Sequence, residues 1–243
     1  MVALALQHEI RPNHLKPATS LAERVLLPGD PHRALAVAQH LLERPRMFNH
    51  HRGLWGYSGV APDGEPLTIQ STGMGGPSAA IVVEELIALG GRRLVRIGTC
   101  GALVDDLELG TLLAVETALP ADGTSIALGA NGHQRPDPKL LERLVAAGAR
   151  PATVASTDLF YDPREGESGA WVRNGAVAVE MEAATIFALA ERRGIEAACV
   201  LGVSDVGGPD GATVRASQER MEEIGLRVGE AGYAALAAPA RSR

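Results

Sequence analysis

Strand-like and helix-like segments alternate along the chain, and this alternation limits the fold more than any other feature of the sequence. Short apolar runs bounded by glycine or proline predict strands, and longer runs with apolar residues at helical spacing predict helices. The expected strands fall within residues 23–30, 53–60, 67–72, 92–103, 111–119, 152–160, 177–182 and 197–205, and the expected helices within 31–43, 78–90, 137–149, 183–194 and 213–236. Strands that alternate with helices predict one α/β domain over residues 1–243, with a central, mixed and twisted sheet.

The composition argues against several classes of partner. The 243 residues carry 23 Lys and Arg against 29 Asp and Glu, a formal net charge of −6. Nucleic acids and anionic membranes attract basic surfaces, so this balance supports neither partner. The two cysteines lie in separate apolar runs and fit neither a metal site nor a disulfide framework. The apolar start lacks a basic leader segment, and no run reaches the ~20 apolar residues of a membrane span. We therefore expect a cytoplasmic protein.

Two glutamates, Glu180 and Glu182, follow an apolar strand-like run and flank Met181. A carboxylate in a buried strand is costly unless it is paired or hydrogen-bonded. Residues two apart on an extended chain point to the same side, so the pattern predicts a polar partner or ligand on that side. A plainer alternative is that Glu182 lies in the first turn of the next helix, where the helix dipole favours an acid.

Further polar and glycine-rich turns follow the other expected strands. In open α/β sheets, ligands bind where the carboxyl ends of the strands meet. A glycine turn that leads into a helix exposes backbone N–H groups, which suit an anion. Arg33 and Arg96 lie within reach of two such turns. Together with the N–H of Gly29 and the hydroxyl of Thr99, they predict a compact oxyanion site.

Each of these features also has a purely structural interpretation. The Pro-Gly-Asp-Pro sequence at 28–31 is an ordinary turn sequence. Arg96 could form a salt bridge with a glutamate instead of binding a ligand, and Asp205 could cap the segment that follows it. The seven histidines show no ligand spacing, so no metal site is expected.

Seven motifs, taken in order, resemble the nucleoside phosphorylase family, in particular its hexameric bacterial branch that acts on purine nucleosides. The motifs are LLPGDPHR (26–33), NHHRGLWGYSG (49–59), TGMGGPSAAI (72–81), VRIGTCGAL (95–103), STDLFY (156–161), AVEMEAA (178–184) and GVSD (202–205). The resemblance covers nearly the whole chain. The resemblance implies a three-layer α/β/α domain. It also implies a reaction in which inorganic phosphate cleaves an N-glycosidic bond, with neither a metal nor another cofactor.

The resemblance further implies a role for each matching residue. The phosphate site would contain Gly29, Arg33, Arg52, Arg96 and Thr99; the ribose site His14, Met74, Met181 and Glu182; and the base site Cys100, Gly101, Phe160, Val179, Glu180, Ser204 and Asp205. Arg52 and His14 match residues that the family donates to a neighbouring subunit. We therefore expect a homo-oligomer and, by resemblance, a hexamer built as a trimer of dimers.

The two glutamates fit this chemistry. A ribose offers a vicinal diol, and the Glu182 carboxylate could accept both hydroxyl protons while Met181 forms an apolar floor. Glu180, on the same side of an extended run, would face the purine edge or fix the orientation of the purine. A buried carboxylate is tolerable when the ligand supplies the hydrogen-bond donors.

Asp205 is the expected general acid, which protonates N7 of the leaving purine. In the family an arginine in the following helix assists this aspartate. Ungapped matching reaches Ser217 at that position, so the sequence leaves three alternatives: Arg215, Arg220 or no assisting arginine.

Other activities on the same fold are alternatives. A uridine phosphorylase recognises uracil with a Gln/Arg pair after the FY motif. Arg164 lies in that segment, but the segment contains no Gln-x-Arg sequence. Asp205 would also have little use with a pyrimidine base. A nucleosidase uses water and needs no arginine pair on one anion. A methylthioadenosine phosphorylase would have an apolar pocket in place of His14. A non-catalytic nucleoside-binding protein is the alternative of another class.

Overall fold

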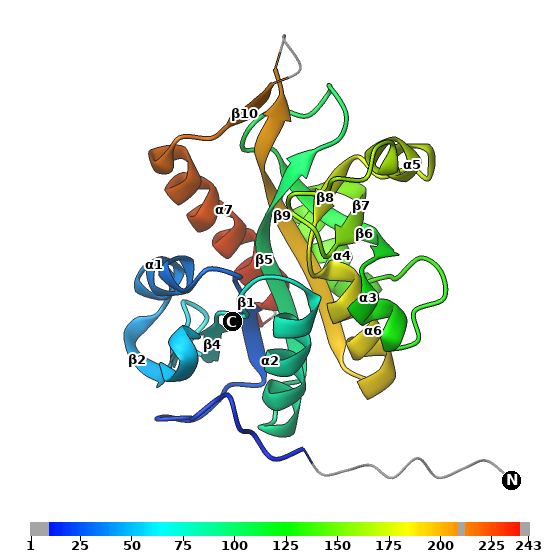
Figure 1. Cartoon of the computed structure of the whole chain (residues 1–243). Helices are drawn as coiled ribbons and strands as arrows, with labels where there is room; N and C mark the ends of the chain where they lie inside the picture. The colour runs from blue at the N-terminus through cyan, green and yellow to red at the C-terminus, as the bar shows by residue number, and fades with distance from the viewer. Residues whose placement is uncertain (1–9, 209–211, 239–243) are drawn as a thin grey trace, which may run out of the picture.

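The structure, a computed structural model, describes residues 10–208 and 212–238, and the strands in these ranges form a ten-stranded mixed sheet (Figure 1). The strands are β1 (Arg24–Leu27), β2 (Glu43–Asn49), β3 (Gly56–Val60), β4 (Pro66–Gln70), β5 (Arg93–Ala102), β6 (Leu112–Ala121), β7 (Arg150–Thr157), β8 (Ala178–Glu180), β9 (Glu196–Gly207) and β10 (Thr213–Arg215). They lie in the order β10-β9-β6-β7-β8-β5-β1-β4-β3-β2. The expected α/β fold with a central mixed sheet is confirmed.

Part of the sheet closes on itself. The first four residues of β5 pair with β1, and its last two pair with β8. Strand β9 pairs with β5 along nearly its whole length and also with β6, which continues through β7 to β8. The five strands β5, β9, β6, β7 and β8 therefore form a small closed barrel, which the sequence pattern does not reveal. Long, twisted strands allow such closure because each end can pair with a different neighbour.

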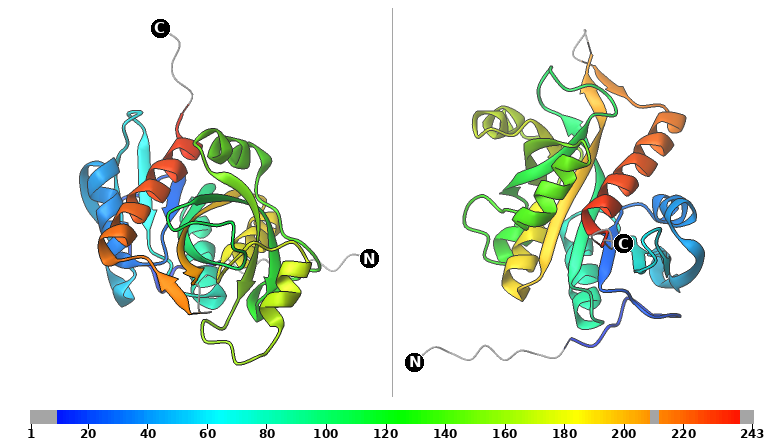
Figure 2. Two further views of the ribbon diagram at one scale, coloured as in Figure 1. Left: turned by 90° about the horizontal axis from the view of Figure 1, so that it is seen from above. Right: turned by 180° about the vertical axis from the view of Figure 1, so that it is seen from behind.

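Helices cover both faces of the sheet (Figures 1 and 2). They are α1 (Pro31–Leu41), α2 (Gly76–Ala88), α3 (Gly123–Ala127), α4 (Pro138–Ala146), α5 (Glu167–Arg173), α6 (Ala183–Arg193) and α7 (Gln218–Leu236), with a 3₁₀ turn η1 (His51–Gly53). Apolar side chains of α2 and α6 pack into one buried core, and those of α1, α4 and α7 pack into another. These two cores on either side of the strands confirm the three layers. No helix of the described ranges is long and apolar enough to cross a membrane.

The segment at 213–236 differs from the sequence prediction of a single helix. Its first residues form β10, in which Arg215 pairs with Asp205 of β9. The helix α7 begins only at Gln218, because the side chain of Ser217 accepts a hydrogen bond from the N–H of Arg220 and caps the helix. Strand β2 and helices α3 and α5 were also not predicted from the sequence.

The carboxyl end of α7 is held by arginines from outside the helix. Arg24 is buried and pairs with Asp63 at 2.5 Å, while the same nitrogen donates to the carbonyl of Leu236 at 3.1 Å. Arg143 donates to the carbonyl of Ala237 at 2.8 Å. The hydrogen bond from Arg24 outweighs the effect of burial and holds the pKa of Asp63 well below its usual range. These cations satisfy the unpaired carbonyls at the helix end and oppose its dipole.

We expect Arg24→Met to lower the free energy of unfolding by roughly 2–3 kcal/mol, because Asp63 and the Leu236 carbonyl lose a charged donor. Asp63→Asn should lose a similar amount at neutral pH. Because the folded-state pKa of Asp63 is depressed, its contribution is present above its unfolded pKa of about 4 and fades as the pH falls below that value. Urea unfolding at pH 7 and at pH 3 measures both effects.

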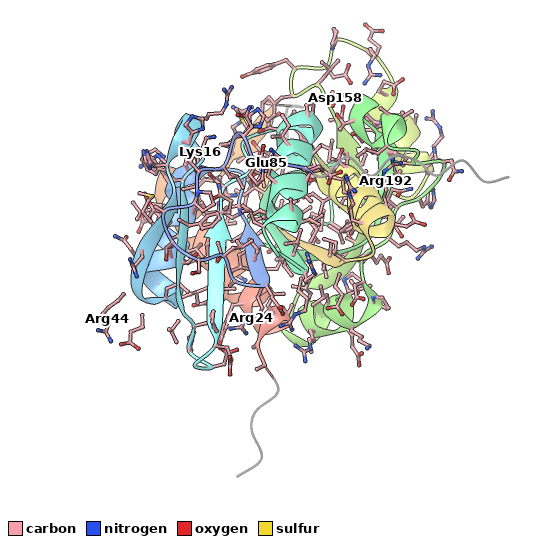
Figure 3. The ribbon with its side chains drawn as sticks, turned by 90° about the horizontal axis from the view of Figure 1, so that it is seen from below. Lys16, Arg24, Arg44, Glu85, Asp158 and Arg192 are labelled. Carbon is pink, nitrogen blue, oxygen red and sulfur yellow. The ribbon has the colours of Figure 1, made fainter. Side chains whose placement is uncertain are left out.

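The exposed pair of Arg44 and Glu43 provides the control (Figure 3 labels Arg24 and Arg44). Arg44→Met should change the free energy of unfolding by less than about 1 kcal/mol, because exposed ion pairs contribute little. Equal losses in the Arg24 and Arg44 variants would contradict the assigned role of Arg24.

Candidate active site

A cavity of about 770 Å³ opens where the carboxyl ends of β1, β4, β5, β7, β8 and β9 meet. Its wall contains every residue that the sequence predicts for the site except His14 and Arg52: Gly29, Arg33, Met74, Arg96, Thr99, Cys100, Gly101, Phe160, Val179, Glu180, Met181, Glu182, Ser204 and Asp205. The strands β1, β4, β5 and β9 run parallel and end at this rim. Strand β8 pairs antiparallel with the last residues of β5, and this pairing brings Val179 and Glu180 to the same cavity.

Arg96, on β5, is a buried cation at the centre of this wall. Its Nε donates to Glu180 at 3.0 Å and its Nη2 pairs with Glu182, whereas its Nη1 has no hydrogen-bond partner in the described part of the chain. Burial disfavours the charge, but Glu182 and Glu180 outweigh it and raise the pKa of Arg96 above its usual range. A buried N–H donor without a partner is costly, so Nη1 suits an acceptor on a bound ligand.

The side chain of Glu180 is already saturated, which differs from the expectation that it faces the purine edge. Its Oε1 accepts hydrogen bonds from the Ser156 hydroxyl at 2.5 Å and the N–H of Ala183 at 2.9 Å. Its Oε2 accepts from Arg96 and from the N–H of Glu182 at 2.9 Å. The carboxylate is fully buried, caps the first turn of α6 and orients Arg96. Its donors therefore come from the protein and not from a ligand.

Glu182 lies at the junction between β8 and α6, as the sequence predicts. One carboxylate oxygen accepts the N–H of Gly75 at 2.5 Å, and the other pairs with Arg96. Gly75 has a φ of 84°, which a residue with a side chain rarely adopts. Burial raises the pKa of Glu182, the charge of Arg96 opposes this rise, and the charge of Glu180 adds to it. Two carboxylate oxygens offer about four acceptor sites, so the donors from the protein leave acceptor capacity for a ligand diol.

A second cation, Arg33, lines the cavity near Arg96. It follows the turn at Gly29, and its N–H donates to the Asp30 side chain, which caps α1. Burial and the neighbouring charge of Arg96 lower the pKa of Arg33. A Cβ on Gly29 would lie 3.2 Å from the carbonyl oxygen of Gly73 and 3.9 Å from Arg96 Nη1, so glycine allows a close approach here. Two cations that repel each other beside a glycine turn form a site for an anion.

Asp205 lies on β9 and lines the cavity. Its Oδ2 accepts the Ser204 hydroxyl at 2.6 Å, and its Oδ1 pairs with Arg215 Nε at 2.9 Å. The Arg215 guanidinium also lies 5.6 Å from the centre of the Phe160 ring, in cation–π geometry. Arg220 instead pairs with Glu223 and does not line the cavity. Of the arginines left open by the sequence, Arg215 is therefore the one that contacts Asp205.

His14 and Arg52 lie outside this cavity but near one another. The ring of His51 donates through Nδ1 to the carbonyl of His14 at 2.9 Å, which joins the two segments. Arg52 is exposed and has a left-handed backbone conformation, with a φ of 59°. The chain thus does not bring these two side chains into its own cavity.

No group of three or more potential metal ligands occurs among the described residues. The charged groups that line the cavity include two cations, a buried carboxylate and an aspartate held by an arginine. These groups can bind an anion, accept hydrogen bonds from a diol and hold a carboxyl near a leaving group.

A family model described as "Phosphorylase superfamily" matches residues 23–237. The chain belongs to the phosphorylase superfamily. Among its relatives are proteins named purine nucleoside phosphorylase DeoD-type from Caldanaerobacter subterraneus subsp. tengcongensis, Jannaschia sp. (strain CCS1) and Geobacillus kaustophilus. They are 36%, 38% and 37% identical to this chain, and each alignment covers 76% of it and 83%, 82% and 81% of the relative, respectively.

Sequence reasoning on this member of the phosphorylase superfamily missed several residues that build the site. Ser156 fixes Glu180, the N–H of Gly75 binds Glu182, and Tyr161 lies at the cavity wall with 84% exposure. Ser156 and Tyr161 belong to the quoted STDLFY motif and Gly75 to TGMGGPSAAI, so position within a motif was an available signal. The contacts of these residues could not be predicted in the same way, because each contact joins segments that are distant in sequence.

Proposed function

We propose that this chain is a purine nucleoside phosphorylase, which uses inorganic phosphate to convert a purine nucleoside into the free base and ribose 1-phosphate. The observation that carries this proposal is the unpartnered Nη1 of Arg96 beside Arg33 in the cavity wall. Arg96 also pairs with the Glu182 carboxylate, which supports an anion site next to a site for a diol. The names of the relatives support the same activity.

In the proposed reaction, phosphate binds to Arg33, Arg96, the N–H of Gly29 and the hydroxyl of Thr99, which line the cavity together. Glu182 accepts hydrogen bonds from the 2′- and 3′-hydroxyls of the ribose. A phosphate oxygen forms a bond to C1′ as the bond between C1′ and N9 breaks. Positive charge that develops on the sugar is stabilised by the adjacent phosphate dianion.

The electron pair of the broken bond leaves with the purine, whose N7 takes a proton from the carboxyl group of Asp205. Phe160, Val179, Cys100 and Gly101 line the part of the cavity next to Asp205 and would contact the base. Glu180 acts indirectly in this scheme, because it orients Arg96 and caps α6.

The proposal is tested by incubating the purified protein with inosine, adenosine, methylthioadenosine or uridine, each with and without phosphate. We expect purine release only with phosphate and no cleavage of uridine, because uracil lacks the N7 that Asp205 would protonate. Cleavage of uridine alone would point to a pyrimidine enzyme. Equal cleavage without phosphate would point to a hydrolase, and no cleavage at all would favour a nucleoside-binding protein. Preference for methylthioadenosine would indicate an apolar 5′ subsite.

Substitution of Arg215 tests its contact with Asp205. We expect Arg215→Met to lower kcat for inosine by about tenfold, because the general acid loses the group that orients it and so part of its catalytic contribution. Arg220→Met is the matched control and should leave kcat within about twofold of wild type, because Arg220 binds Glu223 and a carbonyl away from the cavity. An equal loss in both variants would contradict the assignment.

Assembly and location belong to the same proposal. The cavity lacks His14 and Arg52, which supports a homo-oligomer, by family resemblance a hexamer, in which a neighbouring subunit supplies them. Activity of a monomer at full rate, measured by gel filtration coupled to an assay, would overturn this. One domain over residues 1–243 and a cytoplasmic location stay predictions of the sequence.

A further inference from the structure

Two buried polar side chains, Glu85 and Asn49, organise the surface that carries His14 and Arg52. Neither lines the cavity, and the proposed reaction does not use them directly. Each forms hydrogen bonds with the segments that carry His14 or Arg52. Both side chains are buried although the segments that they bind carry exposed residues.

Glu85, on α2, binds the segment 13–15 with both carboxylate oxygens. It accepts hydrogen bonds from the N–H groups of Asn13 and His14 at 3.0 Å each and of Leu15 at 2.7 Å. It also accepts the Nδ1–H of the His14 ring at 2.7 Å. The ring is therefore fixed in one orientation, with Nε2 as the nitrogen that a ligand can reach. Only 5% of Glu85 is exposed, so this carboxylate serves the N-terminal segment and not solvent (Figure 3).

The ionisation of Glu85 depends on these contacts. Burial favours the neutral acid, but the hydrogen bonds from Leu15, the His14 ring and the N–H groups of Asn13 and His14 outweigh it and lower the pKa of Glu85. The carboxylate thus remains charged and binds the Nδ1 of the His14 ring. A neutral amide at this position would lose the charge-assisted bond to the ring.

Asn49 binds the turn that carries Arg52, as Glu85 binds the segment that carries His14. It is fully buried at the end of β2, and its Oδ1 accepts the N–H of Lys16 at 2.8 Å. Its Nδ2 donates to the carbonyls of Leu54 and His51. The amide therefore spans the turn at 51–54 and ties it to the N-terminal segment. A non-glycine residue such as Arg52 keeps a left-handed conformation only when its surroundings enforce it.

We propose that Glu85 and Asn49 are positioning residues that hold His14 and Arg52 as one rigid unit, which a second copy of this chain receives in its cavity. The bond from the His51 ring to the His14 carbonyl links the two halves of the unit. One unit could then reach the sugar through His14 and the phosphate through Arg52 in the same neighbouring site. This inference rests on the proposed function.

The test measures KM for phosphate, KM for inosine and kcat in Asn49→Ala and Glu85→Gln. Asn49→Ala is expected to raise KM for phosphate about tenfold or more through Arg52, and Glu85→Gln to raise KM for inosine more than KM for phosphate, because small displacements of binding groups have large effects. Thr68→Val is the control: Thr68 is fully buried and binds the N–H of Ala22 and Ser58, away from both segments. It should lower the melting temperature and leave both KM values unchanged.

A mixed oligomer separates positioning in a neighbour from a structural role within one chain. Asn49→Ala chains, co-expressed with Asp205→Asn chains, have intact cavities beside neighbours with an intact His14–Arg52 unit. KM for phosphate should return toward the wild-type value in the mixture. A value that stays as high as in the pure Asn49 variant would overturn the proposal, as would Asn49 and Glu85 variants that lose stability alone. A wild-type protein without phosphate-dependent cleavage would instead overturn the proposed function itself.

Discussion

Asp205→Asn should lower kcat for inosine by about 10²- to 10⁴-fold, the range that general acid catalysis contributes. The asparagine side chain preserves the shape of the group between Ser204 and Arg215, but it cannot transfer the proton that the leaving purine needs at N7. Steady-state assays at saturating phosphate measure the change.

A second substrate shows whether the lost step is protonation. In 7-methylinosine, N7 already carries a methyl group and a positive charge, so the base can leave without a proton from the enzyme. Asp205→Asn should therefore cleave 7-methylinosine within about tenfold of the wild-type rate, because only binding contacts change. Equal losses on both substrates would mean that Asp205 organises the cavity and is not the general acid.

Arg96→Met should produce the largest combined loss of stability and activity. Removal of this cation leaves the buried carboxylates of Glu180 and Glu182 without their counter-charge, which costs about 3–5 kcal/mol for a buried pair. Phosphate also loses the Nη1 donor. Urea unfolding and KM for phosphate measure the two effects. The exposed Arg192 provides the control, since Arg192→Met should stay within about 0.5 kcal/mol of wild type.

A compensated variant distinguishes the two roles of Arg96. Replacing Glu180 and Glu182 by glutamine together with Arg96→Met removes all three charges, so much of the lost stability should return. Phosphate-dependent activity should not return, because the anion site still lacks its cation. An Arg96→Met protein as stable as wild type would contradict the ion-pair network that the structure places at the cavity.

The sequence predicted the location of the cavity better than the contacts within it. Gly29 follows β1, and Thr99 and Asp205 lie in the last parts of β5 and β9. These strands run parallel, so their carboxyl ends meet at one rim of the sheet. The two glutamates also suggested a polar partner on one side of β8. Arg96 is that partner. The sequence had already placed Arg96 in the predicted oxyanion site.

The failures come from contacts between distant segments. Glu180 was expected to face the purine, but Ser156 and Arg96 from two other strands take its oxygens. Barrel closure depends on the short pairing of β8 with β5, which no local pattern signals. Residues 213–236 have helical periodicity, yet pairing with β9 and the Ser217 cap set the helix start later. That pairing is also what brings Arg215 to Asp205.

The central claim is that phosphate is the nucleophile in cleavage of a purine nucleoside. Phosphorus NMR of the wild-type protein with inosine and phosphate tests it most directly, with hypoxanthine followed by absorbance in the same sample. The account predicts one ribose 1-phosphate for each hypoxanthine released and an equal loss of inorganic phosphate. Hypoxanthine release with free ribose and unchanged phosphate would contradict it and leave Arg33 and Arg96 without the anion assigned to them.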